Sequence, residues 1–235
     1  MMDLALIVLV SGVCLLSLLL LAAVAVVRVL SDRRRRDRLH QWAAQHRWTV
    51  TPHPAVDWGA RLPGGNRAGV SVALSTTMNG YVVSVAEYAY TATQITTGSD
   101  GVGGTTTSTS SHTHHFVVTV VRLPHSCPSV AVERRGTISK LAGNLFGSSG
   151  VPTGHPEFDH HFRITAADAG AVRGLVTPAL VQAHLAGAVP TWSLYGAELL
   201  SYRPGRITDP EHLPGIAAPL VHVARLLTGG GIGPV

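Results

Sequence analysis

The stretch "GVSVALSTTMNGYVVSVAEYAY", residues 69–90, decides the fold of this chain. Its first half alternates Val70, Val72 and Leu74 with small polar residues, which is the period of a half-buried strand. Asn79-Gly80 follows, and both positions tolerate positive φ, which favours a tight hairpin turn. Residues 81–90 are rich in Val and Tyr and supply the partner strand. The sequence therefore predicts an antiparallel hairpin here.

Further strands are predicted on the carboxyl side of the hairpin. Residues 114–124, "HHFVVTVVRLP", should pair antiparallel with 81–90, and "SVAVER" (129–134) adds another candidate strand. Between them, residues 91–113 consist mostly of Thr, Ser and Gly. Burial cannot offset the ordering entropy of such a segment, so we expect a flexible loop or an extended, frayed hairpin tip. "TWSLYGAELLSYRPG" (191–205) predicts a second hairpin that turns at Tyr195-Gly196.

Helical patterns occupy much of the remaining carboxyl-terminal half. Residues 165–176 and 177–187 predict two short helices, the second with Thr177 as N-cap and Pro178 at its first position. A last helix follows an N-cap at Asp209 and contains Pro219, which predicts a kink. Residues 136–157 carry a short helical pattern, and 229–235 form a flexible tail. Residues 51–228 are thus one α+β domain with a mainly antiparallel sheet and a few packed helices.

The amino-terminal segment is the most apolar part of the chain. From Leu4 to Val27 there are 24 consecutive residues without a charge. As a helix they would span roughly 36 Å, enough to cross a hydrocarbon layer of about 30 Å. A cleaved signal peptide is the alternative, but the segment begins with Asp3 rather than a positive region. We therefore expect a transmembrane anchor at residues 1–30.

An arginine run follows this segment, within a basic juxtamembrane helix predicted at residues 31–50. Positive charge beside a span favours the cytoplasmic side, so the expected location is the cell membrane, single-pass, with the amino terminus outside and the domain cytoplasmic. Clustered guanidinium groups also attract anionic lipid headgroups, which makes a lipid sensor a weaker alternative function. The candidate headgroup ligands are Arg33, Arg34, Arg35, Arg36 and Arg38.

Charge and cysteine content restrict the function classes. Although the chain carries a net charge of +5, residues 39–235 contain eleven arginines and one lysine against ten acids. This part has no basic stripe, so we expect no nucleic-acid partner. The two cysteines, Cys14 and Cys127, form no disulfide framework, which agrees with a reducing compartment.

Two histidine clusters are candidate metal sites. "HTHH" (112–115) lies where the Thr/Ser-rich segment meets a strand, and His112 and His114 would share one face. "PEFDHHFRIT" (156–165) is expected to be a strand, which points His160 and His161 to opposite faces. A closed site needs more ligands than either cluster offers, so we predict no metal or cofactor. If a metal did bind, the candidate ligands would be His112, His114, His115, His155, Asp159 and His161.

Catalytic motifs are absent from the sequence. There is no H-E-x-x-H, no phosphate-binding G-x-x-x-x-G-K-[ST] and no G-x-S-x-G, and Cys127 has no positioned base. The chain is therefore expected to bind rather than catalyse. A metal-dependent hydrolase that uses the His/Asp cluster is the alternative.

The order of these features resembles a known group of proteins. An apolar span and an arginine cluster are followed by "WAAQHRW", "VRLP", "FDHHFRI" and "LVTPALVQAHL". This order is similar to that of uncharacterised actinobacterial single-pass membrane proteins, which carry basic residues where this chain has His160 and His161. The resemblance implies no catalytic role. The predicted anchor, the nearly neutral domain and the missing catalytic signatures instead favour an accessory or protein-interaction module at the inner face of the membrane, whose partner is another membrane or cytoplasmic protein or a second copy.

Overall fold

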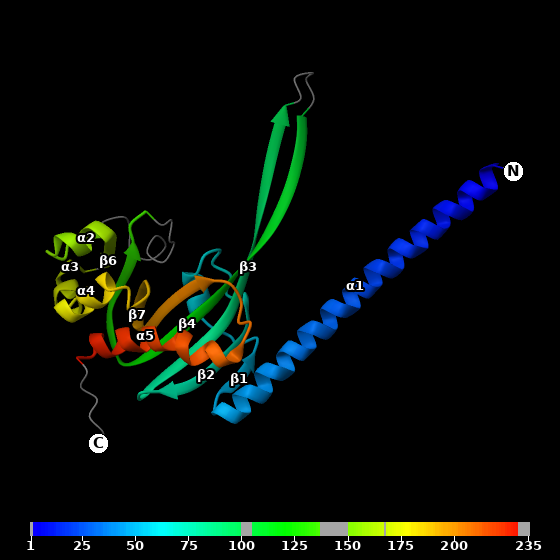
Figure 1. Cartoon of the computed structure of the whole chain (residues 1–235). Helices are drawn as coiled ribbons and strands as arrows, with labels where there is room; N and C mark the ends of the chain where they lie inside the picture. The colour runs from blue at the N-terminus through cyan, green and yellow to red at the C-terminus, as the bar shows by residue number, and fades with distance from the viewer. Residues whose placement is uncertain (1, 100–104, 137–149, 167, 230–235) are drawn as a thin grey trace. The chain divides into compact units, whose positions relative to one another are not determined.

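The structure, a computed structural model, describes residues 2–99, 105–136, 150–166 and 168–229 (Figure 1). The chain divides into two compact units, residues 1–46 and 47–235. The first contains the helix α1 (Met2–His46). The second contains the sheet and all the other helices. Its strands are β1 (Thr49–Pro52), β2 (Val70–Met78), β3 (Tyr81–Ser99), β4 (Thr105–Arg134), β5 (Gly150–Val151), β6 (Phe162–Ala166) and β7 (Trp192–Pro204). Its helices are the 3-10 turns η1 (Trp58–Arg61) and η2 (Pro210–His212), and α2 (Pro156–His161), α3 (Ala169–Leu175), α4 (Pro178–Leu185) and α5 (Leu213–Leu227).

All the strand pairs are antiparallel, and β4 is the central strand. The order is β1-β2-β3-β4-β6-β5, with β7 also paired to β4. Residues 116–122 of β4 lie between β3 and β7, whereas residues 130–132 lie between β6 and β7. The candidate strand at 129–134 is therefore the end of β4 rather than a separate strand.

The predicted hairpin is confirmed. β2 and β3 pair from Met78↔Tyr81 back to Val70↔Tyr88, with one bulge between Val70 and Val72. At the turn, Asn79 and Gly80 have φ angles of 51° and 82°. These are the left-handed values that the dipeptide tolerates and that the twist of a hairpin requires.

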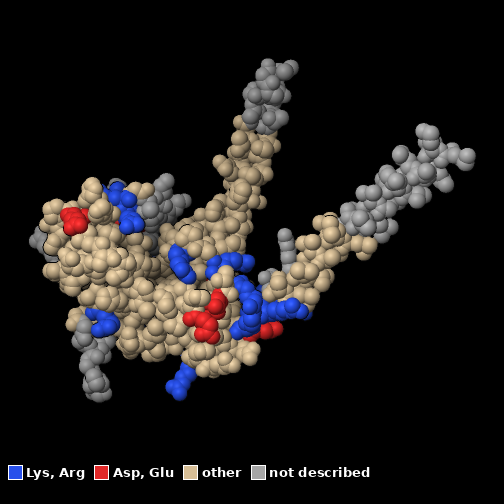
Figure 2. Space-filling model, in the orientation of Figure 1, with Lys and Arg blue, Asp and Glu red and all other residues tan. Residues whose placement is uncertain are grey.

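The Thr/Ser-rich segment forms a two-stranded ribbon, which we call the arm (residues 89–99 and 105–115). Its strands pair without a register shift from Ala89↔His115 to Ser99↔Thr105. The arm extends away from the rest of the sheet (Figure 1), and Figure 2 shows no Lys, Arg, Asp or Glu along its described part. Of the two predicted alternatives, a flexible loop and an extended hairpin, residues 91–99 and 105–113 therefore form the extended hairpin. Residues 100–104, at the tip, lie outside the described part.

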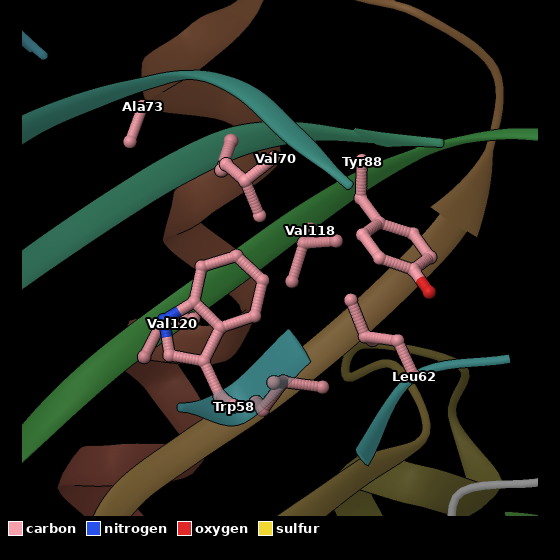
Figure 3. Close-up of a cluster of buried hydrophobic side chains, with 9 residues drawn as sticks. Trp58, Leu62, Val70, Ala73, Tyr88, Val118 and Val120 are labelled. Atoms are coloured by element: carbon pink, nitrogen blue, oxygen red, sulfur yellow. The ribbon is translucent and has the colours of Figure 1, made fainter. Parts of the chain in front are cut away.

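Each face of the sheet is covered differently. On one face, α5 packs against β3, β4 and β7 through an apolar stripe. The residues of this stripe are Leu213, Ala217, Leu220, Val221, Val223 and Ala224. Figure 3 shows a second buried cluster, in which Trp58 of η1 lies against Val118 and Val120 of β4. The loop at residues 53–69 therefore packs as a cover over the sheet.

The helix caps predicted from sequence are confirmed. The Thr177 hydroxyl accepts a hydrogen bond from Leu180 N, and Pro178 begins α4. Asp209 accepts from Glu211 N, but it caps η2, and α5 starts four residues later, at Leu213. Pro219 lies inside α5, as expected. The helical pattern predicted at residues 138–146 and the flexible tail at 230–235 lie outside the described residues.

The predicted fold class was wrong in its amino-terminal transmembrane helix. The structure is a mainly antiparallel sheet with several helices, and the apolar run and the arginine run share one continuous helix, α1. Within residues 2–99, 105–136, 150–166 and 168–229, no helix has the combination of length and apolarity that a membrane crossing requires. The prediction of a single-pass membrane protein depended on this helix and was wrong for the same reason. The predicted location of the domain is not tested by this finding and stays a prediction.

The second predicted hairpin was also wrong. Residues 192–204 form one strand, β7, which pairs with β4 on both sides of Gly196. Register shifts flank the Cys127↔Gly196 pair, and Gly196 has a φ of 59°. The extra residues at these shifts belong to β4, so the bulges lie on β4 opposite Gly196, and the Tyr-Gly signal stands at an irregular point of one strand instead of at a turn.

Candidate functional site

The histidines predicted as metal ligands are spread over separate elements. His112, His114 and His115 lie at the base of the arm on β4, and the first two are exposed. The His114 ring stacks on Tyr90 of the neighbouring strand, with ring centroids 5.0 Å apart. This contact gives His114 a packing role at the base of the arm.

The segment "PEFDHHFRIT" is not one strand, and that prediction was wrong for residues 156–161. These residues form α2, with Pro156 in its first turn, and only Phe162 begins a strand. Phe158 and Phe162 are buried and stack on each other at 5.0 Å. A spacing of four places both rings on one side of a helical turn, which explains why an alternating strand pattern misread them.

Asp159 has a structural role in this segment. Its carboxylate accepts hydrogen bonds from Thr153 N, at 3.1 Å, and from the Thr153 hydroxyl, at 2.9 Å. His155, His160 and His161 are exposed around it. In the described part of the chain, no three His, Cys, Asp or Glu side chains are close enough together to hold a metal ion.

His184, which the sequence reasoning did not single out, is the buried histidine. It is 2% exposed and lies against the rings of Phe158, Phe162 and Trp192. Its Nε2 accepts a hydrogen bond from Trp192 Nε1 at 3.0 Å. Burial lowers the pKa of His184 to about 4, so the ring is neutral at pH 7. Its spacing of four residues from Leu180 on α4 was the signal that placed it in the core.

The described part of the sheet carries one polar cleft beside the η1 cover. The cleft has a volume of about 360 Å³. Its apolar walls come from Val56 and Trp58 of the cover and from Val82 and Val120 of the sheet, and its polar groups belong to Asp57, Ser84, Arg122 and Glu198. The strand pairing explains the arrangement, because Val82, Arg122 and Glu198 occupy one cross-strand row on β3, β4 and β7.

An ion pair between a buried arginine and a half-buried glutamate supports this cleft from the η1 side. Arg61 is 5% exposed, and its Nη2 donates to Glu198 Oε2 at 2.8 Å. Burial lowers the pKa of Arg61, while the charge of Glu198 opposes that shift. The guanidinium also lies over the ring of Tyr195, 5.7 Å from its centroid. Arg61 therefore fixes both Glu198 and Tyr195 in position.

Two exposed apolar side chains are connected with the cleft, and a third lies on the arm. In the described part of the second unit, three large hydrophobic side chains are exposed: Val82 at 53%, Tyr195 at 54% and Ile95 at 66%. Val82 lines the cleft, and Tyr195 is joined to it through Arg61. Sequence periodicity could not find this site, because it joins residues of the cover to residues of β7 that are 137 positions away.

The remaining candidates from the sequence are Cys127 and the arginines of α1. Burial raises the pKa of the Cys127 thiol, which disfavours the nucleophilic thiolate. Arg33, Arg34, Arg36 and Arg38 are exposed on α1 and Arg35 is half-buried. Lipid headgroup binding by these arginines stays a prediction.

The fold and the cleft together define a mainly antiparallel sheet domain with a long arm and a charged, partly apolar cleft. No protein-family model matches the chain, and no curated protein matches it. Among solved structures, it is similar to the crystal structure of the mycobacterial trehalose monomycolate transport factor A, TtfA. The two share 13% sequence identity and a TM-score of 0.51, over 85% of this chain and 96% of that one. This likeness shows the fold alone, and the resemblance to uncharacterised actinobacterial membrane proteins stays a prediction.

Proposed function

We propose that the chain is an accessory protein-interaction module and that the cleft between the η1 cover and the sheet is where its partner binds. The observation that carries the proposal is the make-up of this surface. Apolar side chains of the cover and the sheet and the charged side chains of Asp57, Arg122 and Glu198 line it together. Specific protein–protein interfaces likewise combine apolar contacts with hydrogen-bonding and charged groups.

The residues around the cleft are of the types that dominate binding energies. Tyr, Trp and Arg are enriched among the interface residues whose loss weakens binding most. Tyr195 and Trp58 are anchored here by packing and by Arg61, so they lose little side-chain entropy when a partner binds. A pre-formed surface of this kind needs no rearrangement to accept a partner.

The charges of the rim indicate the chemistry of the partner segment. Glu198 is neutralised by Arg61, whereas Arg122 and Asp57, which carry opposite charges, are both exposed at the cleft. The segment that fits has an apolar side chain to cover Val82 and an acidic residue next to it to meet Arg122. The description of the structural neighbour as a transport factor supports an accessory role of this kind.

Site-specific crosslinking tests the proposal. A photoreactive amino acid at Tyr195 of the full chain should crosslink one protein reproducibly in the cells that make it. Arg122→Glu should reduce the yield roughly tenfold, since a well-placed interface arginine contributes about 1–3 kcal/mol. Arg203→Glu is the matched control, because Arg203 is exposed on β7 outside the cleft. Its yield should not change.

The crosslinked peptide completes the test. Mass spectrometry should place the crosslink on a segment with an apolar residue beside an acidic one. Either a protein crosslinked equally well by the Arg122→Glu and Arg203→Glu chains, or a segment without an acidic residue, would show that this cleft is not the partner site.

A further inference from the structure

The arm continues β3 and β4 beyond every other described strand of the sheet. On the β3 side the last neighbour is Gly69, whose carbonyl accepts from Ala89 N at 2.8 Å. On the β4 side the last neighbour is Gly205, whose N–H donates to His115 O at 2.9 Å. Past these two contacts, no described strand lies beside either edge of the arm.

The hydrogen bonds identify which residues of the arm face outward. Because Ala89 N points away from β4, the odd-numbered residues that follow on β3 point their N–H and C=O groups the same way. Thr96 O agrees with this alternation, because it faces β4 and accepts from the Ser108 hydroxyl. The free β3 edge therefore presents the backbone groups of Thr91, Thr93, Ile95 and Thr97.

This edge has none of the features that normally prevent strand pairing. Natural edge strands are protected by charged side chains, proline, bulges or shortness. From Ala89 to Ser99, β3 has no charged residue, no histidine and no proline, and its register with β4 has no shift. The opposite edge differs, because β4 carries His112, His114 and His115. An isolated two-stranded ribbon is also marginally stable in water, so an additional strand would stabilise the arm.

We infer that the arm is a self-association site, in which the β3 edge pairs antiparallel with the β3 edge of a second copy about a two-fold axis at Ile95. This register joins the two arms into one four-stranded sheet. It places Ile95 against the second copy's Ile95 and Thr93 against the second copy's Thr97.

A second copy fits this edge for three reasons. The symmetric register brings no charge against a like charge, because the edge is neutral. It covers Ile95, the most exposed large hydrophobic side chain among the described residues outside α1. It also sets Thr opposite Thr, and the arm already contains such a pair, with the Thr91 and Thr113 hydroxyl oxygens 3.1 Å apart.

Cysteine crosslinking of the full chain tests the inference. In a chain with Cys14→Ser and Cys127→Ser, Ile95→Cys should form a disulfide-linked dimer under mild oxidation. Directly opposed residues of a hydrogen-bonded antiparallel pair have Cα atoms about 5.5 Å apart, within the range that a disulfide spans. Thr109→Cys, the cross-strand neighbour of Ile95 on β4, is the control. It should give at least tenfold less dimer, because two β3 strands would separate the Thr109 residues.

Two proline variants show which edge of the arm pairs with the second copy. Thr93→Pro removes one outward N–H from the β3 edge and should reduce the Ile95→Cys dimer at least tenfold. Ser111→Pro, opposite it on β4, removes an outward N–H from the other edge and should leave the dimer unchanged. Arg122→Glu should also leave it unchanged, which separates this inference from the partner site at the cleft. Equal dimer from Ile95→Cys and Thr109→Cys, or equal loss with both prolines, would overturn the inference.

Discussion

His184 lies in the core, and its Nε2 atom accepts a hydrogen bond from Trp192. Because Nε2 accepts the indole N–H, the proton of the neutral ring is on Nδ1. Protonation of Nε2 would break this bond and bring a charge among Phe158, Phe162 and Trp192. The folded state therefore favours the neutral ring, which is the physical origin of its low pKa of about 4.

This residue predicts a pH dependence of stability. The pKa of His184 falls from its ordinary value of 6.5 to about 4 on folding. Between these values the unfolded chain binds a proton that the folded chain does not, so the free energy of unfolding decreases as the pH falls from about 6.5 to 4. The decrease due to His184 should be about 3 kcal/mol. Urea unfolding at several pH values measures it.

Two variants separate His184 from the other titrating groups. His184→Gln keeps an acceptor for Trp192 without a titratable ring, so it should flatten the pH dependence in this window. His222→Gln, at an exposed position of α5, should keep the wild-type slope. An unchanged slope in His184→Gln would contradict the prediction.

Local residue patterns were enough to predict some side-chain roles but not others. The caps at Thr177 and Asp209 depend on neighbours two or three positions away, so the sequence revealed them. The Arg61–Glu198 pair joins positions 137 apart, and only the folded sheet brings them together. Long-range pairs of this kind are what single-sequence reasoning lacks.

At the scale of elements, the strands with the clearest alternation were predicted correctly. The β2–β3 hairpin followed from its period and its Asn-Gly turn. The errors at α2 and β7 arose because each sequence pattern is compatible with two local structures. Aromatic residues four apart suit a helical turn as well as a strand, and a glycine with positive φ suits a position opposite a bulge as well as a turn. Tertiary contacts decided each case.

The loop that carries Gly64 supports the base of the arm. Gly64 has a φ of 81°, and a Cβ placed there would overlap the ring of Tyr90. Gly136 has the same φ of 81°, and no atom of the described residues lies within 4 Å of a Cβ placed there, so it is a matched control. Gly136→Ala should cost about 1–2 kcal/mol from backbone strain alone. Gly64→Ala should cost about 1–3 kcal/mol more, because the added methyl group displaces a packed ring.

Urea unfolding of the two alanine variants provides the measurement. The double variant Gly64→Ala/Tyr90→Ala should recover part of the extra loss relative to Tyr90→Ala alone, because the ring that caused the overlap is gone. Equal costs for Gly64→Ala and Gly136→Ala would mean that the ring moves aside freely.

At the scale of the whole molecule, the mainly antiparallel sheet followed from alternation, whereas its order did not. Nothing in the local pattern shows that β4 pairs with β3, β6 and β7, because these partners are chosen by packing. The transmembrane helix was wrong, although its apolar run is the strongest hydropathy signal in the chain. The cleft likewise arises only when η1, β3, β4 and β7 come together.

Amide hydrogen exchange should be slow in the body of the second unit and fast in the arm. Amides of Val83–Tyr88 and Val117–Val121 lie in strands paired on both sides and should be the most protected. In a dilute sample, the outward amides of Thr91, Thr93, Ile95 and Thr97 should exchange at least about tenfold faster than those of Ala92, Gln94 and Thr96, which face β4. Residue-resolved NMR measures this alternation. Uniform rates along the arm would contradict the assigned orientation.

β3 and β4 are each one continuous strand from the described part of the arm to the middle of the sheet. The arm can therefore transmit mechanical force to the sheet. Any force on its far end is carried along two covalent chains directly to the strands on which α5 and the η1 cover rest. The pairing of the two strands has no register shift within residues 82–99 and 105–122. Tension on the arm would therefore reach the interior of the body before it reached any surface loop.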